Sequence, residues 1–148
     1  MIGERPNTYT FTKAITEQLV NEEVEHLPMA IVRPSIVAGA IKEPLPGWVD
    51  NLNGPTGIVV ACGHGVLRSM YANPDYIADI IPVDIVINLM CAVAYKTAGQ
   101  YDRETGKKPD KIPVYNCNSG TDSPITWREL SYHGIYACHK YPFENILM

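Results

Sequence analysis

The chain has 148 residues, a length that suits one compact domain rather than two. Hydrophobic residues make up 46% of it and charged residues 19%, which is the balance of a folding chain and not of a disordered one. The net charge of −4 and the lack of a basic block argue against nucleic acid as a partner.

The sequence contains no recognisable metal or redox motif. Its four cysteines, Cys62, Cys91, Cys117 and Cys138, are widely and unevenly spaced, with no C-x-x-C pair. The histidines do not stand at metal-ligand spacing either. We therefore expect no metal site, and reduced thiols that are buried or half-buried in an intracellular protein.

No membrane span is predicted. The opening residues, "MIGERPNTYT", have no apolar core of the kind that a signal peptide needs. The most apolar window, residues 77–95, contains Asp79, Pro82, Asp84 and Asn88, which a bilayer would penalise heavily. We expect it to form a strand and a helix.

The first predicted element is a helix that is capped by Asn7 or Thr8 and runs to about His26. Apolar residues recur along it at three- and four-residue steps and form one stripe: Phe11, Ala14, Ile15 and Leu19. Glu17 is expected on the opposite, polar side. Pro28 stops the helix.

A buried strand is predicted next, over Met29–Val37. This segment is short, rich in branched side chains and nearly all apolar, which is typical of a parallel strand covered on both faces. Pro34 should end its regular pairing. A long helix followed by such a strand fits the later part of a β-α-β unit.

The segment from Ala38 to Gly57 is predicted to be a loop because it is rich in proline and glycine. It contains Trp48, a large apolar side chain. A connection of this length is often a lid or a binding segment. The alternative, that Trp48 only pins the loop to the body of the domain, is equally open.

Beyond the loop, Ile58–Ala61 is a short strand candidate and Ile77–Val83 is expected to be extended. Asp84 is a suitable cap for the helix that follows, which should end before Gly99.

The last part of the chain predicts an exposed loop over Gln100–Lys111, a short strand over Ile112–Asn116 and a final helix over Thr126–Lys140. Strands and helices thus alternate, and the predicted fold class is α/β with a parallel sheet.

One short motif near the start of the chain contains residues that could take part in catalysis. In "TYTFTK", Tyr9 and Lys13 stand four residues apart and lie on one face of a helix. A free phenol has a pKa near 10, but an ammonium about 5 Å away favours the phenolate by ~3 kcal/mol at an effective dielectric constant of ~20. Such a phenol can give a proton to a carbonyl oxygen while a hydride reaches the carbonyl carbon. The spacing alone is common in amphipathic helices, so a purely structural role for both residues is an alternative.

Several longer sequence segments are more specific for a protein family than the Tyr9 and Lys13 spacing. "PNTYTFTKA", "MAIVRPSIV", "KEPLPGWVDNLNGPTG" and "ADIIPVDIVINLM" occur in one order. Together they resemble the extended short-chain dehydrogenase/reductases, and within them the alcohol-forming fatty acyl-CoA reductases of animals. The resemblance covers about Pro6 to Trp127.

The resemblance implies roles for individual residues. Tyr9 would be the catalytic acid, and Lys13 its partner, which also binds the ribose of NADPH. The segment Pro34-Ser35-Ile36-Val37 would pass beside the nicotinamide, and the loop with Trp48 would border the acyl-CoA site. The implied reaction takes a long-chain fatty acyl-CoA to the aldehyde and then to the alcohol, with two hydride transfers from NADPH.

The sequence also departs from this family. It contains no G-x-x-G-x-x-G fingerprint, and Cys62-Gly63-His64-Gly65 predicts a tight turn instead of a phosphate loop. The family also has a catalytic Ser or Thr on the strand that precedes the Tyr-Lys helix, and this sequence has no such strand before Tyr9. We therefore expect residues 1–148 to be a partial NAD(P)-binding reductase domain, the C-terminal half of a Rossmann-like domain without the family's C-terminal domain. Such a chain should be inactive alone and poorly stable, because its sheet would have an unpaired edge.

Two other functions stay open at this point. Another extended reductase, such as a sterol dehydrogenase or a sugar epimerase, would share Tyr9 and Lys13, although residues 42–57 favour the acyl-CoA reductases. A truncated, non-catalytic isoform could instead dock on intact subunits. By resemblance, the longer protein would be associated with the peroxisomal or endoplasmic reticulum membrane.

Overall fold

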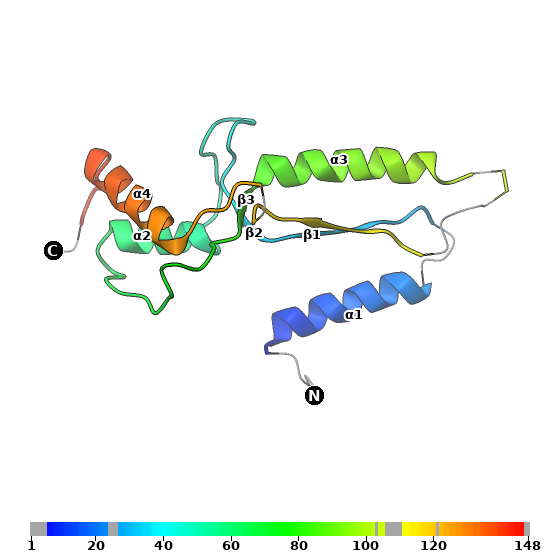
Figure 1. Ribbon diagram of the computed structural model, residues 1–148, viewed down its shortest axis with the longest axis horizontal. Helices are drawn as coiled ribbons and strands as arrows, with labels where there is room; N and C mark the ends of the chain where they lie inside the picture. Colours follow the sequence, from blue (N-terminus) through cyan, green and yellow to red (C-terminus); the bar gives the residue numbers. More distant parts are fainter. Residues whose placement is uncertain (1–5, 24–26, 103, 106–110, 121, 147–148) are drawn as a thin grey trace. The chain divides into compact units, whose positions relative to one another are not determined.

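The computed structural model describes residues 6–23, 27–102, 104–105, 111–120 and 122–146. The chain divides into two units. The first contains residues 1–33 and 90–115, and the second contains residues 34–89 and 116–148. The ribbon is shown in Figure 1.

Helices and strands alternate along the chain, which confirms the predicted α/β class. In order, the elements are α1 (Thr8–Glu23), β1 (Ile31–Pro34), β2 (Ile36–Ala38), α2 (Pro55–Gly63), β3 (Ile80–Pro82), α3 (Val83–Gly99), β4 (Val114–Cys117) and α4 (Trp127–Lys140). Strand β1 pairs with β4, and β2 pairs with β3. The β2–β3 pair is parallel, with Ile36 opposite Ile80 and Ala38 opposite Pro82.

Helix α1 begins where the sequence predicts. The backbone N–H of Thr10 donates to Asn7 Oδ1 at 2.9 Å, so Asn7 caps the first turn. The predicted end near His26 lies outside the described residues. The predicted sides of α1 are wrong in part, because Ile15 and Leu19 of the apolar stripe are exposed and Glu17 is half-buried. The Glu17 carboxylate accepts from both Nε and Nη2 of Arg33 on β1, with Nε at 2.9 Å. This bidentate pair raises the pKa of Arg33, chiefly through the hydrogen bonds from its side chain.

The predicted strand Met29–Val37 is two strands, and it is not buried on both faces. The chain changes partner at Ser35, whose N–H donates to Cys117 O at 2.8 Å, whereas the N–H of Ile36 donates to Asp79 O at 3.1 Å. Pro34 has no N–H and ends β1. Arg33, Pro34, Ile36 and Val37 are all exposed. An apolar run does not reveal such a change of neighbour.

The predicted strand Ile58–Ala61 is wrong, because these residues lie inside α2. The helix starts after Gly54, which has a φ of 56°, and Pro55 occupies the start of its first turn. The predicted loop is therefore helical over its last three residues. An apolar run of four residues has no periodicity that separates a strand from a helix.

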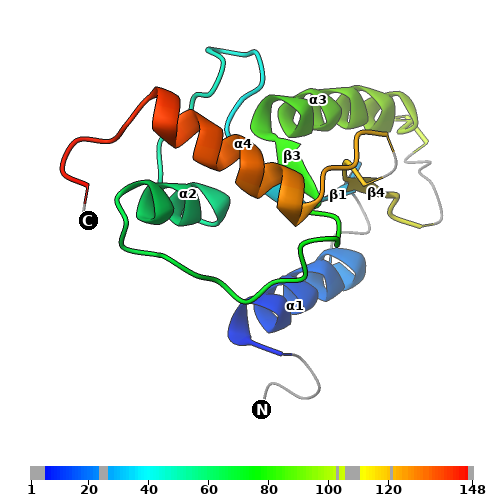
Figure 2. The same ribbon diagram turned by 60° about the vertical axis from the view of Figure 1, so that its left-hand side comes forward.

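The end of α2 is the predicted tight turn. Gly65 has a φ of 75°, and its N–H donates to Cys62 O at 2.9 Å. In Figure 2, α2 and α4 lie side by side. Phe143, which follows α4, lies against the end of α2: its ring centroid is 4.8 Å from that of His64, and a Cβ on Gly63 would meet the Phe143 ring at 2.1 Å. A side chain at position 63 would therefore require the Phe143 ring to move.

The later elements follow the predictions more closely. Helix α3 ends at Gly99 itself, and β4 begins two residues later than the strand predicted over Ile112–Asn116. The described residues of the predicted loop after α3 (100–102, 104–105 and 111) contain no helix or strand. Residues 103 and 106–110 lie outside the description. Helix α4 has the capping box of Thr126 and Glu129 at its start.

Few side chains are well buried among the described residues. The buried apolar ones are Ala40, Ala78, Ile81, Val86, Val93 and Cys117, and no large side chain is fully enclosed. Cys117 is buried and Cys138 half-buried, as predicted, but Cys62 and Cys91 are exposed. No described helix is long and apolar enough to cross a membrane, and no cluster of potential metal ligands occurs in the described part.

The capping box of α4 gives a stability prediction. Replacing Thr126 with Ala removes the hydroxyl that accepts from Glu129 N at 3.2 Å, and should lower the free energy of unfolding by about 1 kcal/mol. The measurement is urea unfolding followed by circular dichroism. Ser131→Ala is the control, because Ser131 lies inside the helix and caps nothing. Equal effects of the two variants would contradict the role of the cap.

Candidate active site

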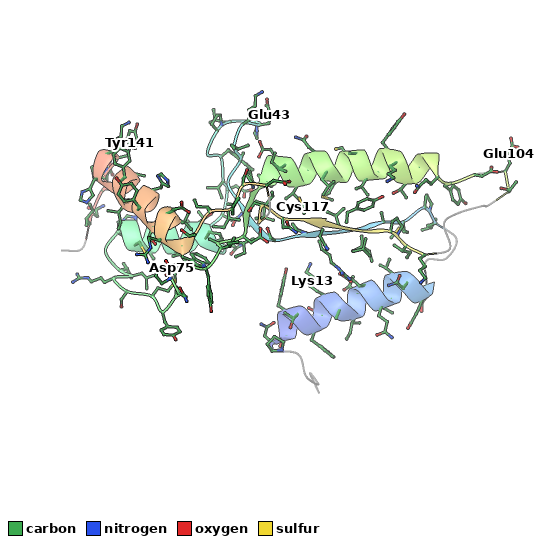
Figure 3. The ribbon with its side chains drawn as sticks, in the orientation of Figure 1. Lys13, Glu43, Asp75, Glu104, Cys117 and Tyr141 are labelled. Atoms are coloured by element: carbon green, nitrogen blue, oxygen red, sulfur yellow. The ribbon has the colours of Figure 1, made fainter. Side chains whose placement is uncertain are left out.

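Tyr9 and Lys13 come together on the first two turns of α1. Lys13 Nζ lies over the Tyr9 ring, 5.6 Å from its centroid. Tyr9 is 68% exposed, so its phenol is open to a reactant. Figure 3 labels Lys13 on this helix. The predicted pairing of the two side chains on one helical face is thus present, and it places a positive charge next to the phenol ring.

The second predicted group, Pro34 to Val37, lies in the other unit at the change from β1 to β2. The Ile36 N–H donates to Asp79 O, just before β3. In a parallel pair alternate residues face the same neighbour, so the backbone of Val37 points away from β3. The side chains of Ile36 and Val37 are exposed. The segment therefore has apolar side chains available for a flat ligand ring.

A carboxylate that sequence reasoning missed holds this segment in place. Asp79 Oδ1 accepts from the N–H of Ser119 at 2.9 Å and from its hydroxyl at 3.2 Å. The backbone O of Asp79 accepts from Ile36. Asp79 thus joins the start of β2 to the residues after β4. Figure 3 labels Cys117, the last residue of β4.

The same contacts change the acidity of Asp79. The hydrogen bond from the Ser119 backbone lowers the pKa of Asp79, and the Ser119 and Ser35 hydroxyls lower it further, against the opposing effect of burial. Ser35 Oγ is buried and has no hydrogen-bond partner, but it lies near enough to Asp79 to lower the pKa of that carboxyl. A signal was available in the sequence, since Asp79 is an acidic residue inside the otherwise apolar predicted strand Ile77–Val83.

Asp84 does not cap α3 in the predicted way. It lies in the first turn of the helix, and its carboxylate accepts from the backbone N–H groups of Ile41, Lys42 and Glu43 at 3.0, 3.0 and 3.1 Å. Burial raises the pKa of Asp84, but these hydrogen bonds lower it more, so the net shift is downward. The loop after β2 takes the carboxylate because its N–H groups have no strand partner.

Comparison with known proteins identifies the family. Residues 1–90 match the NAD-binding family described as Male sterility protein. The chain belongs to this family. The match confirms the predicted Rossmann-like fold class and supports a nicotinamide cofactor.

Individual relatives agree with this assignment. The chain is 45% identical over 145 residues to "Fatty acyl-CoA reductase 1" of Gallus gallus, 46% to that of Xenopus laevis and 46% to "Fatty acyl-CoA reductase 2" of Mus musculus. Each match covers 98% of this chain and 27% of the relative. The resemblance inferred from the sequence is therefore confirmed.

The Asp79 contact predicts a pH-dependent stability. Because the folded pKa of Asp79 is lowered, its contribution is present above the unfolded value of about 3.9 and is lost as the pH falls through the lower folded value. The free energy of unfolding should differ between the unaltered chain and Asp79→Asn by a constant amount from pH 7 to pH 5. The difference should shrink below about pH 4.

Urea unfolding at each pH measures this difference, in which the other titrating carboxylates cancel. A difference that stays constant or grows toward pH 3 would contradict the assignment to the charged form of Asp79.

Proposed function

We propose that this chain supplies the tyrosine–lysine part of a fatty acyl-CoA reductase, which reduces a long-chain acyl-CoA with NADPH to the aldehyde and then to the fatty alcohol. The observation that carries the proposal is the position of Lys13 Nζ 5.6 Å from the centroid of an exposed Tyr9 ring, in a chain of this family. The names of the relatives support the substrate class.

Tyr9 would act as the proton donor. As negative charge develops on the carbonyl oxygen, the phenol O–H gives it a proton. The ammonium of Lys13 and the positive N-terminal end of α1 both favour the negative charge that is left on the phenol oxygen.

Lys13 and the pair Ile36 and Val37 would each suit a different part of a nicotinamide cofactor. The exposed ammonium of Lys13 can donate to ribose hydroxyls, and the exposed Ile36 and Val37 can contact a flat ring. When bound, such a cofactor supplies a hydride to the carbonyl carbon. The first reduction would give a hemithioacetal, and its loss of the CoA thiol would leave the aldehyde. Once a proton from solvent has restored the phenol and a second NADPH has replaced the oxidised cofactor, Tyr9 would donate again in the second reduction.

We also propose that the 148 residues alone do not turn over substrate. They contain no G-x-x-G-x-x-G, the loop that cradles a dinucleotide pyrophosphate at a helix N-terminus. The choice of NADPH, the long acyl chain and a location at the peroxisomal or endoplasmic reticulum membrane stay predictions from the resemblance.

A chimera tests the function. In it, this chain replaces the matching 145-residue part of Gallus gallus fatty acyl-CoA reductase 1. The chimera should reduce a long-chain acyl-CoA with NADPH, and Tyr9→Phe should lower kcat about 100-fold or more, since a positioned acid contributes at least that much. Lys13→Met should lower kcat and raise the KM for the cofactor.

Tyr136→Phe is the matched control, because Tyr136 is an exposed tyrosine on α4, 59% exposed against 68% for Tyr9. It should leave kcat within twofold. A folded chimera without reductase activity would contradict the proposed function. Near-normal turnover by Tyr9→Phe would contradict the role of the tyrosine and favour a structural one.

A further inference from the structure

Lys13 has a neighbour one helical turn away on each side along α1. Tyr9 precedes it by four residues, and Glu17 follows it by four. Side chains at this spacing have Cβ atoms about 5–6 Å apart, so a lysine can reach either neighbour. In the structure, Lys13 Nζ lies over the Tyr9 ring, 5.6 Å from its centroid. The direction that Lys13 takes decides whether its charge serves Tyr9.

Glu17 is the competing partner for that charge. It is the first acidic residue of α1, since residues 8–16 contain none. A carboxylate and an ammonium four residues apart form ion pairs readily on a helix surface. If Lys13 paired with Glu17, the carboxylate would offset the positive charge that acts on the phenol, and it would draw the ammonium away from a cofactor ribose.

Arg33 on β1 holds the Glu17 carboxylate in another direction. Arg33 Nε donates to Glu17 Oε1 at 2.9 Å, and Nη2 donates to Oε2. The two parallel bonds fix the carboxylate in position and orientation. The Arg33 side chain is 51% exposed and that of Glu17 32%. A pair this exposed adds little to the stability of the fold, so its main consequence is where it places the Glu17 charge.

We propose that Arg33 is a positioning residue that keeps the Glu17 carboxylate away from Lys13, so that the Lys13 ammonium stays with Tyr9 and the cofactor ribose. This inference rests on the proposed function and adds a residue to it. Arg33 acts through Glu17 and touches neither substrate nor cofactor. A lysine at position 33 would do this poorly, because an ammonium lacks the planar fork that holds both carboxylate oxygens.

The alternative is that the Arg33–Glu17 pair only fastens α1 to β1. The two roles predict different patterns among variants. If the pair fastens the helix, loss of either partner does the same harm, and loss of both does no better. If Arg33 restrains a competitor, its loss is harmful only while Glu17 keeps its charge. Glu17→Gln, Arg33→Met and the double variant therefore separate the two roles.

The first arm of the test measures the position of Lys13 in the 148-residue chain by NMR. Protons that lie over the face of an aromatic ring are shifted upfield. The ε-methylene protons of Lys13 should show this shift in the unaltered chain and in Glu17→Gln, lose it in Arg33→Met and regain it in the double variant. Tyr9→Leu removes the ring and so identifies the signal.

The second arm measures turnover in the chimera described above. Arg33→Met should lower kcat/KM for a long-chain acyl-CoA about fivefold or more and raise the KM for NADPH, because Lys13 is drawn from both. Glu17→Gln and the double variant should stay within about twofold of the unaltered chimera.

Arg128→Met is the matched control, because Arg128 is an exposed arginine that pairs with Asp75 and lies on α4. It should change neither the Lys13 signal nor kcat/KM. Arg33→Gln replaces Arg33→Met if that variant does not fold.

Equal losses in the two single variants, without recovery in the double variant, would overturn the proposal and leave the pair as a fastening of α1. An upfield Lys13 signal that survives the loss of Arg33 would overturn it too. A folded chimera that is inactive before any substitution would count against the proposed function, whereas the NMR arm still decides whether Arg33 directs Lys13.

Discussion

The hydrogen bonds of Asp79 hold the segment Pro34 to Val37, which we propose to contact the cofactor. The backbone oxygen of Asp79 accepts a hydrogen bond from the N–H of Ile36 at the start of β2. Its carboxylate accepts from both the N–H and the hydroxyl of Ser119, which follows β4. Ser35, between β1 and β2, bonds to Cys117 of β4. The chain can therefore leave one strand partner and join another at Ser35 without losing its backbone hydrogen bonds. Pro34 to Val37 thus run from the last residue of β1 into the first two residues of β2, where β2 lies parallel to β3.

Asp84 repeats this use of a carboxylate on a different segment. In both cases, a buried or half-buried acid replaces a missing strand partner for backbone N–H groups, and in both cases the hydrogen bonds lower the pKa of the acid. Few large side chains are buried in the described residues, so apolar packing alone orders these segments weakly. Polar anchors supply the order that a ligand surface needs.

Local patterns in the sequence predicted the parts of the fold that local forces decide. The cap at Asn7 and the spacing of Tyr9 and Lys13 both act within one or two helical turns. The wrong predictions concern side chains whose partners lie far away in the sequence. Asp84 meets the loop across more than forty positions, Asp79 meets Ser119 across forty, and Glu17 turns toward Arg33 sixteen residues on. No periodicity encodes such pairings. Helix α2 was missed because four apolar residues fit a strand equally well.

The central claim is that this chain belongs to the hydride-accepting site of an acyl-CoA reductase. The most direct test is to supply the chimera with a long-chain acyl-CoA and NADPH deuterated at the transferable position, and to analyse the product by mass spectrometry. The account predicts a fatty alcohol that carries deuterium from two hydride transfers at its first carbon. A product without deuterium, or release of the free acid without reduction, would contradict it.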